Sequence, residues 1–285
     1  MYIHTLLAHR TSMLSLEISP PKTEGGLESL FASLIKLRAH DPAFVSVTCT
    51  TRQSPNVALE LAARIKRELG IETVLHVTSV GKTRDDVRAL LDEAAVSGIE
   101  NLFVVRGDTP TGYEAPSDGF RYASDLIRFI RETGAPLSLG AACYPEGHLE
   151  SRSTEEDLRQ LKTKVEAGVD FLITQLFFDP QLFLEYRERL SRAGILVPVL
   201  PGILPVTSLA QLQRSREWGK ATVPERLERA LRASVDDPAT ARRVGLAEIR
   251  QTCRVLRSAG VSSVHLFSLN QWQTMDELCA ELGKG

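Results

Sequence analysis

The sequence has no paired cysteines, no long hydrophobic run and no excess of charge of one sign. Its 285 residues include 34 Lys and Arg against 36 Asp and Glu, so the formal net charge is −2. Without a basic excess, we expect no nucleic-acid partner. The four cysteines lie far apart and form no CxxC pair. This spacing disfavours a zinc site or a disulfide framework and is typical of a reducing, cytoplasmic compartment.

Signals for membranes and for the commonest nucleotide-binding fold are missing as well. No run of about 18 apolar residues occurs, and the N-terminal stretch MYIHTLLAHRTS has too short an apolar run for a signal peptide. We therefore expect neither a membrane partner nor secretion. No GxGxxG motif follows any apolar run, which disfavours an open dinucleotide-binding sheet.

Short apolar runs, each suited to a buried strand, recur through the chain. There are eight of them, at residues 13–19, 44–50, 73–79, 101–108, 137–145, 171–178, 197–203 and 262–270. Segments with apolar residues at helical spacing lie between them, and several end near a glycine that can cap a helix.

Strands alternating with amphipathic helices imply parallel pairing with both sheet faces covered. Eight such units predict one (β/α)8 barrel over residues 1–285, with an open doubly wound sheet as the alternative. Residues 236–260 predict an additional helix before the last strand.

Polar residues stand near the ends of these strands, where the active site of such a barrel forms. A buried carboxylate is costly unless it is paired or protonated, so Glu17 is a candidate general acid; the alternative is a loop cap or an arginine partner. Asp108 lies in RGDTPTG, which also reads as an ordinary turn. Gln175 needs a hydrogen-bonding partner, either a ligand or a core group. His76 and His148 have no HxxxH or cysteine partner, so we expect no metal site.

Nine stretches in one order carry a resemblance that covers nearly the whole chain. They are EISPPKT, FVSVT, LHVTS, VVRGDTPTG, RYASDLI, AACYPEGHLES, DLRQLKTKVEAGVDFLITQLFFD, AGILVPVLPGILPV and SSVHLFSLN. On these motifs the sequence resembles the methylenetetrahydrofolate reductase family, in its bacterial form with the catalytic barrel alone. The resemblance implies reduction of 5,10-methylenetetrahydrofolate to 5-methyltetrahydrofolate by NADH or NADPH, through non-covalent FAD, with both substrates using one site in turn. It also implies a homo-oligomer, a dimer or a tetramer.

The resemblance gives roles to individual residues. Glu17 takes the place of the acid that protonates N10 of the folate, and we expect the apolar strand and the flavin ring together to keep it protonated. Asp108 would lie near the flavin and the pterin and stabilise the iminium cation, while Gln175 and Leu209 would bind the substrate. The implied FAD contacts are Thr48, His76, Arg106, Gly107, Asp108, Tyr122, Ala123, Tyr144, His148, Asp157, Gln160 and Lys164. From the residues alone, Asp157 and Lys164 would instead belong to a solvated helix face.

Two departures from the family pattern leave other functions open. The stretch CTTRQSPNV after Thr48 has no glycine, which leaves a reductase without FAD, or one acting on a related one-carbon carrier. Leu209 stands where the family often has an aromatic residue, which leaves a folate- or flavin-binding protein active only with a partner. The choice between NADH and NADPH also stays open.

Overall fold

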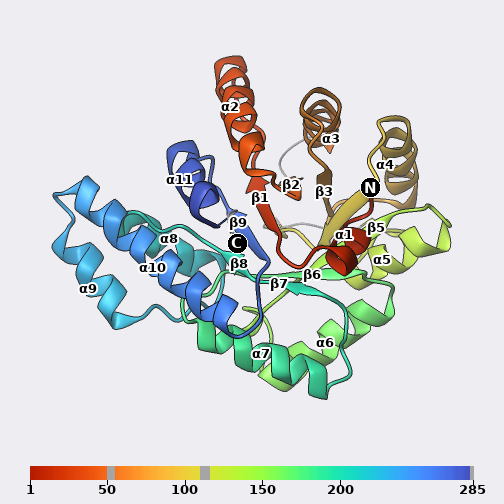
Figure 1. Cartoon of the computed structure of the whole chain (residues 1–285). Helices are drawn as coiled ribbons and strands as arrows, with labels where there is room; N and C mark the ends of the chain where they lie inside the picture. The colour runs from red at the N-terminus through yellow and green to blue at the C-terminus, as the bar shows by residue number, and fades with distance from the viewer. Residues whose placement is uncertain (50–54, 110–115, 283–285) are drawn as a thin grey trace.

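The computed structural model describes residues 1–49, 55–109 and 116–282, and within them one parallel sheet curls into a barrel (Figure 1). The strand order is β7-β6-β5-β4-β3-β2-β1-β9-β8, and every pairing is parallel. The strands are β1 (Leu14–Ile18), β2 (Phe44–Val47), β3 (Thr73–Thr78), β4 (Asn101–Val105), β5 (Ser138–Cys143), β6 (Phe171–Thr174), β7 (Val199–Leu200), β8 (Gly202–Ile203) and β9 (Val264–Phe267). The predicted barrel is confirmed.

Helices surround the strands (Figure 1). Three helices lie between β8 and β9 along the chain. They are α1 (Ile3–His9), α2 (Glu24–Leu37), α3 (Pro55–Arg64), α4 (Arg84–Val96), α5 (Ala123–Glu132), α6 (Thr154–Glu166), α7 (Pro180–Arg192), α8 (Leu209–Trp218), α9 (Glu225–Ala233), α10 (Pro238–Ser258) and α11 (Trp272–Leu282). The short helices η1 (Arg38–His40) and η2 (Ile65–Leu69) continue α2 and α3. The predicted additional helix is α10. None of the helices in the described ranges is long and apolar enough to cross a membrane.

The seventh apolar run closes the barrel in two halves. Its first half, β7, pairs with β6, and its second half, β8, pairs with β9. Pro201 between them has no N–H, and its carbonyl accepts from the His265 N–H at 2.9 Å. A Cβ on Gly202 would lie 2.3 Å from the Thr174 carbonyl oxygen, so glycine at this position allows β8 to lie close to the end of β6. One predicted strand is therefore two short ones.

Alternation along the strands explains how a glutamate fits into an apolar run. On β1, Leu14, Leu16 and Ile18 belong to the main core cluster that the strands share with the helices. Successive side chains of a strand point to opposite faces, so Ser15 and Glu17 point into the barrel. The carboxyl group therefore stands at the C-terminal end of the barrel interior.

The lower part of the interior is filled by aromatic rings and closed by a helix. Phe44, Phe103 and Phe171 form one cluster, with ring centroids 6.4 Å apart in both contacts of Phe171. Ile3 from α1 packs into the same cluster, and its N–H donates to Asn101 Oδ1 at 2.9 Å. This end of the barrel is solid, which leaves the C-terminal end for ligands.

Candidate functional site

Two adjoining cavities lie at the C-terminal ends of the strands and share Ala142 and Tyr144. The larger, here the Glu17 cavity, has a volume of about 540 Å³. It is lined by Glu17, Ser19, Thr48, His76, Phe103, Val105, Ala142, Tyr144, Ile173, Thr174, Gln175, Leu176, Leu204, Trp218, Phe267 and Leu269. The smaller, here the Lys164 pocket, has about 240 Å³. It is lined by Arg106, Tyr122, Ala123, Ser124, Ala142, Tyr144, His148, Glu150, Ser151, Glu156, Asp157, Gln160, Leu161 and Lys164.

Two histidines flank the Glu17 carboxyl at the floor of the Glu17 cavity. Glu17 Oε2 lies 3.7 Å from His76 Nε2 and 3.9 Å from His265 Nε2. His265 is fully buried, and its Nδ1 lies 2.8 Å from Ser15 Oγ, which fixes the ring. Sequence reasoning missed His265, although its place in the alternating stretch VHLF put it on the same inner face.

The apolar strand alone does not keep Glu17 protonated, and the expected effect of the flavin ring stays a prediction. Burial raises the pKa of this carboxyl, but the interactions with His265 and His76 outweigh burial, so the pKa lies below its usual value. Glu17 is therefore ionised near neutral pH. To act as an acid it would have to take up a proton when a ligand changes its surroundings.

His76 presents to the Glu17 cavity a ring nitrogen, Nε2, that makes no hydrogen bond within the described residues. The residue is 8% exposed, and its Nε2 accepts or donates no hydrogen bond within the described chain. Burial lowers the pKa of His76, the Glu17 charge acts in the opposite direction, and the net direction is downward. A buried nitrogen left in this way is a place where a ligand can supply the missing partner.

Gln175 finds both of its amide partners in the chain itself. Its Oε1 accepts from the Leu176 N–H at 2.9 Å, and its Nε2 donates to the Trp218 carbonyl at 3.1 Å. Thr48, on the same cavity wall, donates to Ser19 Oγ at 2.9 Å. The amide of Gln175 thus has its hydrogen-bonding partners within the protein, which is the alternative to a ligand contact. Its side chain nevertheless lines the Glu17 cavity.

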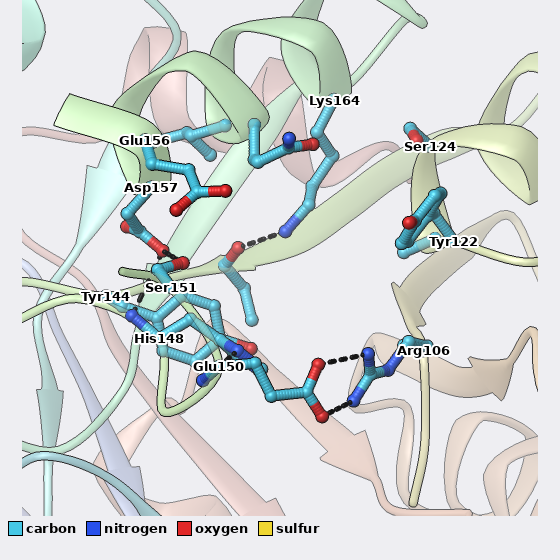
Figure 2. Close-up of a pocket in the computed structure, with 14 residues that line it drawn as sticks. Arg106, Tyr122, Ser124, Tyr144, His148, Glu150, Ser151, Glu156, Asp157 and Lys164 are labelled. Atoms are coloured by element: carbon cyan, nitrogen blue, oxygen red, sulfur yellow. Dashed lines mark hydrogen bonds and ion pairs between the residues drawn. The ribbon is translucent and has the colours of Figure 1, made fainter. Parts of the chain in front are cut away.

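Lys164 and Asp157 line the Lys164 pocket rather than an outer helix face (Figure 2). Lys164 Nζ donates to the Ala142 carbonyl at 2.8 Å, and burial lowers the pKa of Lys164. Asp157 is buried and accepts from the His148 N–H at 3.0 Å and from Ser151 Oγ at 3.1 Å. The buried carboxylate therefore shapes the loop between β5 and α6.

Arg106 and Glu150 form a bidentate ion pair on the other side of the Lys164 pocket (Figure 2). Arg106 donates from Nη1 and Nη2 to the two Glu150 oxygens, each at 2.6 Å. These hydrogen bonds raise the pKa of Arg106 and lower the pKa of Glu150.

Tyr144, on the wall between the two cavities, has its pKa raised by burial to about 12 and stays protonated.

The structure gathers most of the predicted site residues and leaves three outside. Thr48, His76, Arg106, Tyr122, Ala123, Tyr144, His148, Asp157, Gln160, Lys164, Glu17 and Gln175 line the two cavities. Asp108 is exposed beyond β4, and Gly107 has a φ of 83° in the same loop. Leu209, the first residue of α8, packs against a separate apolar cluster around Leu212. Residues 50–54 of the stretch after Thr48 lie outside the described residues.

Comparison with known proteins identifies the family. The family model described as methylenetetrahydrofolate reductase matches residues 2–283. The chain belongs to the methylenetetrahydrofolate reductase family. Membership places it among the oxidoreductases of folate and one-carbon metabolism and supports reduction of methylenetetrahydrofolate.

Relatives from bacteria and plants agree with this assignment. The 5,10-methylenetetrahydrofolate reductase of Pectobacterium carotovorum subsp. carotovorum is 32% identical over 271 residues, which are 95% of this chain and 90% of the relative. Methylenetetrahydrofolate reductase (NADH) 1 of Zea mays is 31% identical over 283 residues, 94% of this chain and 48% of the relative.

A solved structure shares the reductase-family fold. This Clostridium thermocellum protein, described as binding two copies of 5-methyl-5,6,7,8-tetrahydrofolic acid, superposes with a TM-score of 0.71. The match covers 98% of each chain at 16% identity. At that identity the likeness concerns the fold alone.

Proposed function

We propose that this chain reduces 5,10-methylenetetrahydrofolate to 5-methyltetrahydrofolate, with hydride from NAD(P)H and with FAD bound non-covalently. The two substrates would use the Glu17 cavity in turn. The observation that carries the proposal is the Glu17 carboxyl, which stands at the end of β1 in a mostly apolar cavity of about 540 Å³ in a chain of this family. An ionisable group on an apolar cavity wall is a candidate for acid chemistry.

The two cavities have groups suited to a flavin dinucleotide. His76 Nε2, which makes no hydrogen bond within the described residues, can bond to a polar ring atom in the Glu17 cavity. In the Lys164 pocket, Lys164 and Arg106 are cations near the start of α5, whose first turn directs backbone N–H groups outward. Lys164 and the helix N-terminus would favour an anionic diphosphate, and Arg106 would join them by exchanging its Glu150 partner for the diphosphate. FAD, when bound, would accept hydride from the nicotinamide and pass it to the folate.

Glu17 would supply the proton that opens the folate ring at N10. A ring system lying against the carboxyl group excludes water, and desolvation favours the neutral acid over the carboxylate. The neutral acid can then donate its proton to N10. His76 is placed to exchange this proton with the carboxyl, because its Nε2 lies 3.7 Å from Glu17 Oε2.

Other residues would orient the substrate. Gln175 would bind the pterin through its amide, which lines the cavity beside Thr174 and Leu176. Asp108 would stabilise the cationic iminium form, a role that rests on the family resemblance. Leu209 packs against the cluster around Leu212 outside both cavities, so no substrate contact is proposed for it. The NADH in the name of the Zea mays relative favours NADH as the hydride source.

A turnover assay of the purified protein tests this proposal. We expect a yellow protein that releases FAD on denaturation and that oxidises NADH over many turnovers only when methylenetetrahydrofolate is present. Mass spectrometry should identify 5-methyltetrahydrofolate as the product. Bound FAD with NADH oxidation by an artificial quinone but no folate product would contradict the substrate, and a colourless protein that makes the product would contradict the flavin.

A further inference from the structure

A short segment that begins at the last residue of α8 crosses between the walls of both cavities. This strap, residues 218–222, is tied at three points. Gln175 Nε2 donates to the Trp218 carbonyl at 3.1 Å, and Lys220 Nζ donates to the Ser151 carbonyl at 3.1 Å. The Thr222 N–H donates to both Glu146 carboxylate oxygens, at 2.9 and 3.0 Å. The strap therefore connects the end of β6 with the loop between β5 and α6.

The strap places an indole ring on the wall of the Glu17 cavity. Trp218 is 40% exposed, although an indole usually lies mostly buried, and it lines the cavity with Phe267 and Leu269. The next residue, Gly219, lets the backbone lie on Gln175, because a Cβ there would come within 3.0 Å of Gln175 Cγ. Close approach and three ties position the ring before any ligand enters.

We propose that Trp218 is a specificity-determining residue, whose indole forms the aromatic wall against which the flat ring of the substrate lies. The inference rests on the proposed function, because it takes the occupant to be the pterin of a folate or the ring of a nicotinamide. Leu209 does not line the cavity, so Trp218 is the residue of α8 that offers it a ring. Flat heterocycles gain affinity by stacking on aromatic side chains.

Gln175 would then have a second task beside binding the pterin. Its Nε2 holds the Trp218 carbonyl, and its Oε1 is held by the Leu176 N–H. A substrate that draws the Gln175 amide toward itself weakens the bond to Trp218 at the same time. Ring position and amide recognition are therefore coupled through one side chain.

Calorimetric titration with 5-methyltetrahydrofolate tests the wall directly. Trp218→Leu keeps apolar bulk but removes the ring, and we expect binding about tenfold weaker, on the scale of one stacking contact. Trp218→Phe should stay within about threefold of wild type, because it keeps an aromatic face. Trp272→Phe is the matched control, since Trp272 lies on α11 against the main core and should leave affinity unchanged. The same variants, tested for flavin reduction by NADH, show whether the nicotinamide shares the wall.

Tryptophan emission gives a second measurement that does not depend on affinity. The sequence has two tryptophans, so Trp272→Phe leaves Trp218 as the only reporter. Its emission should be quenched by the folate and should become less anisotropic when Glu146→Ala releases the strap at Thr222. An anisotropy that Glu146→Ala does not change would contradict the strap.

The outcomes separate this inference from the function on which it rests. If wild type binds folate and Trp218→Leu binds it equally well, with NADH reduction also unchanged, the aromatic wall is wrong while the proposed function stands. If wild type neither binds nor reduces folate, the proposed function is wrong and the inference fails with it. Weaker folate binding, slower flavin reduction by NADH, or both in Trp218→Leu would support Trp218 as the aromatic wall of the cavity.

Discussion

Replacing Glu17 by Gln tests the acid role, because it keeps the size and polarity of the side chain while removing the transferable proton. General acid catalysis contributes about 10²–10⁴-fold to a rate, equivalent to about 2.7–5.4 kcal/mol of barrier. We expect transfer of hydride to the folate to slow by this factor in Glu17→Gln. Reduction of the flavin by NADH needs no proton from this residue and should stay within a few-fold of wild type.

The structure also sets the size of a proton uptake that should accompany substrate binding. The interactions with His265 and His76 outweigh burial and hold the pKa of Glu17 below its usual value, so the carboxyl is ionised near neutral pH. If the acid must be neutral in the complex, each substrate molecule bound brings in about one proton. Binding should therefore tighten as the pH falls.

Calorimetry in two buffers of different ionisation enthalpy measures this uptake. Methylenetetrahydrofolate is titrated into the oxidised protein without a reductant, so that no turnover occurs. Wild type should take up about one proton and Glu17→Gln almost none, while Glu24→Gln, an exposed control at the start of α2, should behave as wild type. Equal uptake by wild type and Glu17→Gln, or none by either, would refute the acid role.

Three further predictions concern the cofactor, the fold and pH. Lys164→Met should weaken FAD binding about 10- to 150-fold, because it removes a charge-assisted hydrogen bond. Lys162→Met, at an exposed position on the same helix, is the control and should not weaken FAD binding. If both variants retain FAD equally well, the cofactor assignment is wrong. Gly245→Ala should lower the free energy of unfolding by about 1–3 kcal/mol or more, because its Cβ would lie 1.8 Å from the Val206 carbonyl oxygen. Gly25→Ala is the control, because a Cβ at Gly25 meets no atom within 4 Å. Urea denaturation of the two variants measures the difference. Burial lowers the pKa of His76, so as the pH falls the unfolded chain binds a proton at this residue before the folded chain does. The free energy of unfolding should therefore fall below about pH 6.5, by up to about 1.4 kcal/mol per pH unit. Between about pH 7.5 and pH 5.5, the urea midpoint should fall less in His76→Phe than in wild type.

The sequence was sufficient for the barrel and for most of the cavity lining. Period-two alternation put Leu14, Leu16 and Ile18 on one face of a strand, which leaves Glu17 on the other whatever the chain's identity. The convergence of strand ends then predicted that Glu17 and Gln175 would meet, and both line the Glu17 cavity. The seventh run was predicted as a single strand, because the change of pairing partner at Pro201 leaves no mark on hydrophobicity.

Contacts between distant loops could not be predicted from the sequence. The Gln175 bond to Trp218 joins residues 43 apart, and the Arg106 pair with Glu150 joins residues 44 apart. Neither pair has a local pattern, because each depends on how two loops meet over the barrel. The effect of the two histidines on Glu17 could not be predicted for the same reason. An apolar strand indicates burial, but the two imidazoles that lower the pKa come from β3 and β9.

The most direct test of the account is an anaerobic stopped-flow record that separates the two hydride transfers. The protein is first reduced with NADH or NADPH and then mixed with methylenetetrahydrofolate, while flavin absorbance is followed. We predict that the flavin band bleaches with the nicotinamide and returns with the folate, the return being slowed about 10²–10⁴-fold in Glu17→Gln. A band that bleaches and does not return with the folate in wild type would contradict the central claim.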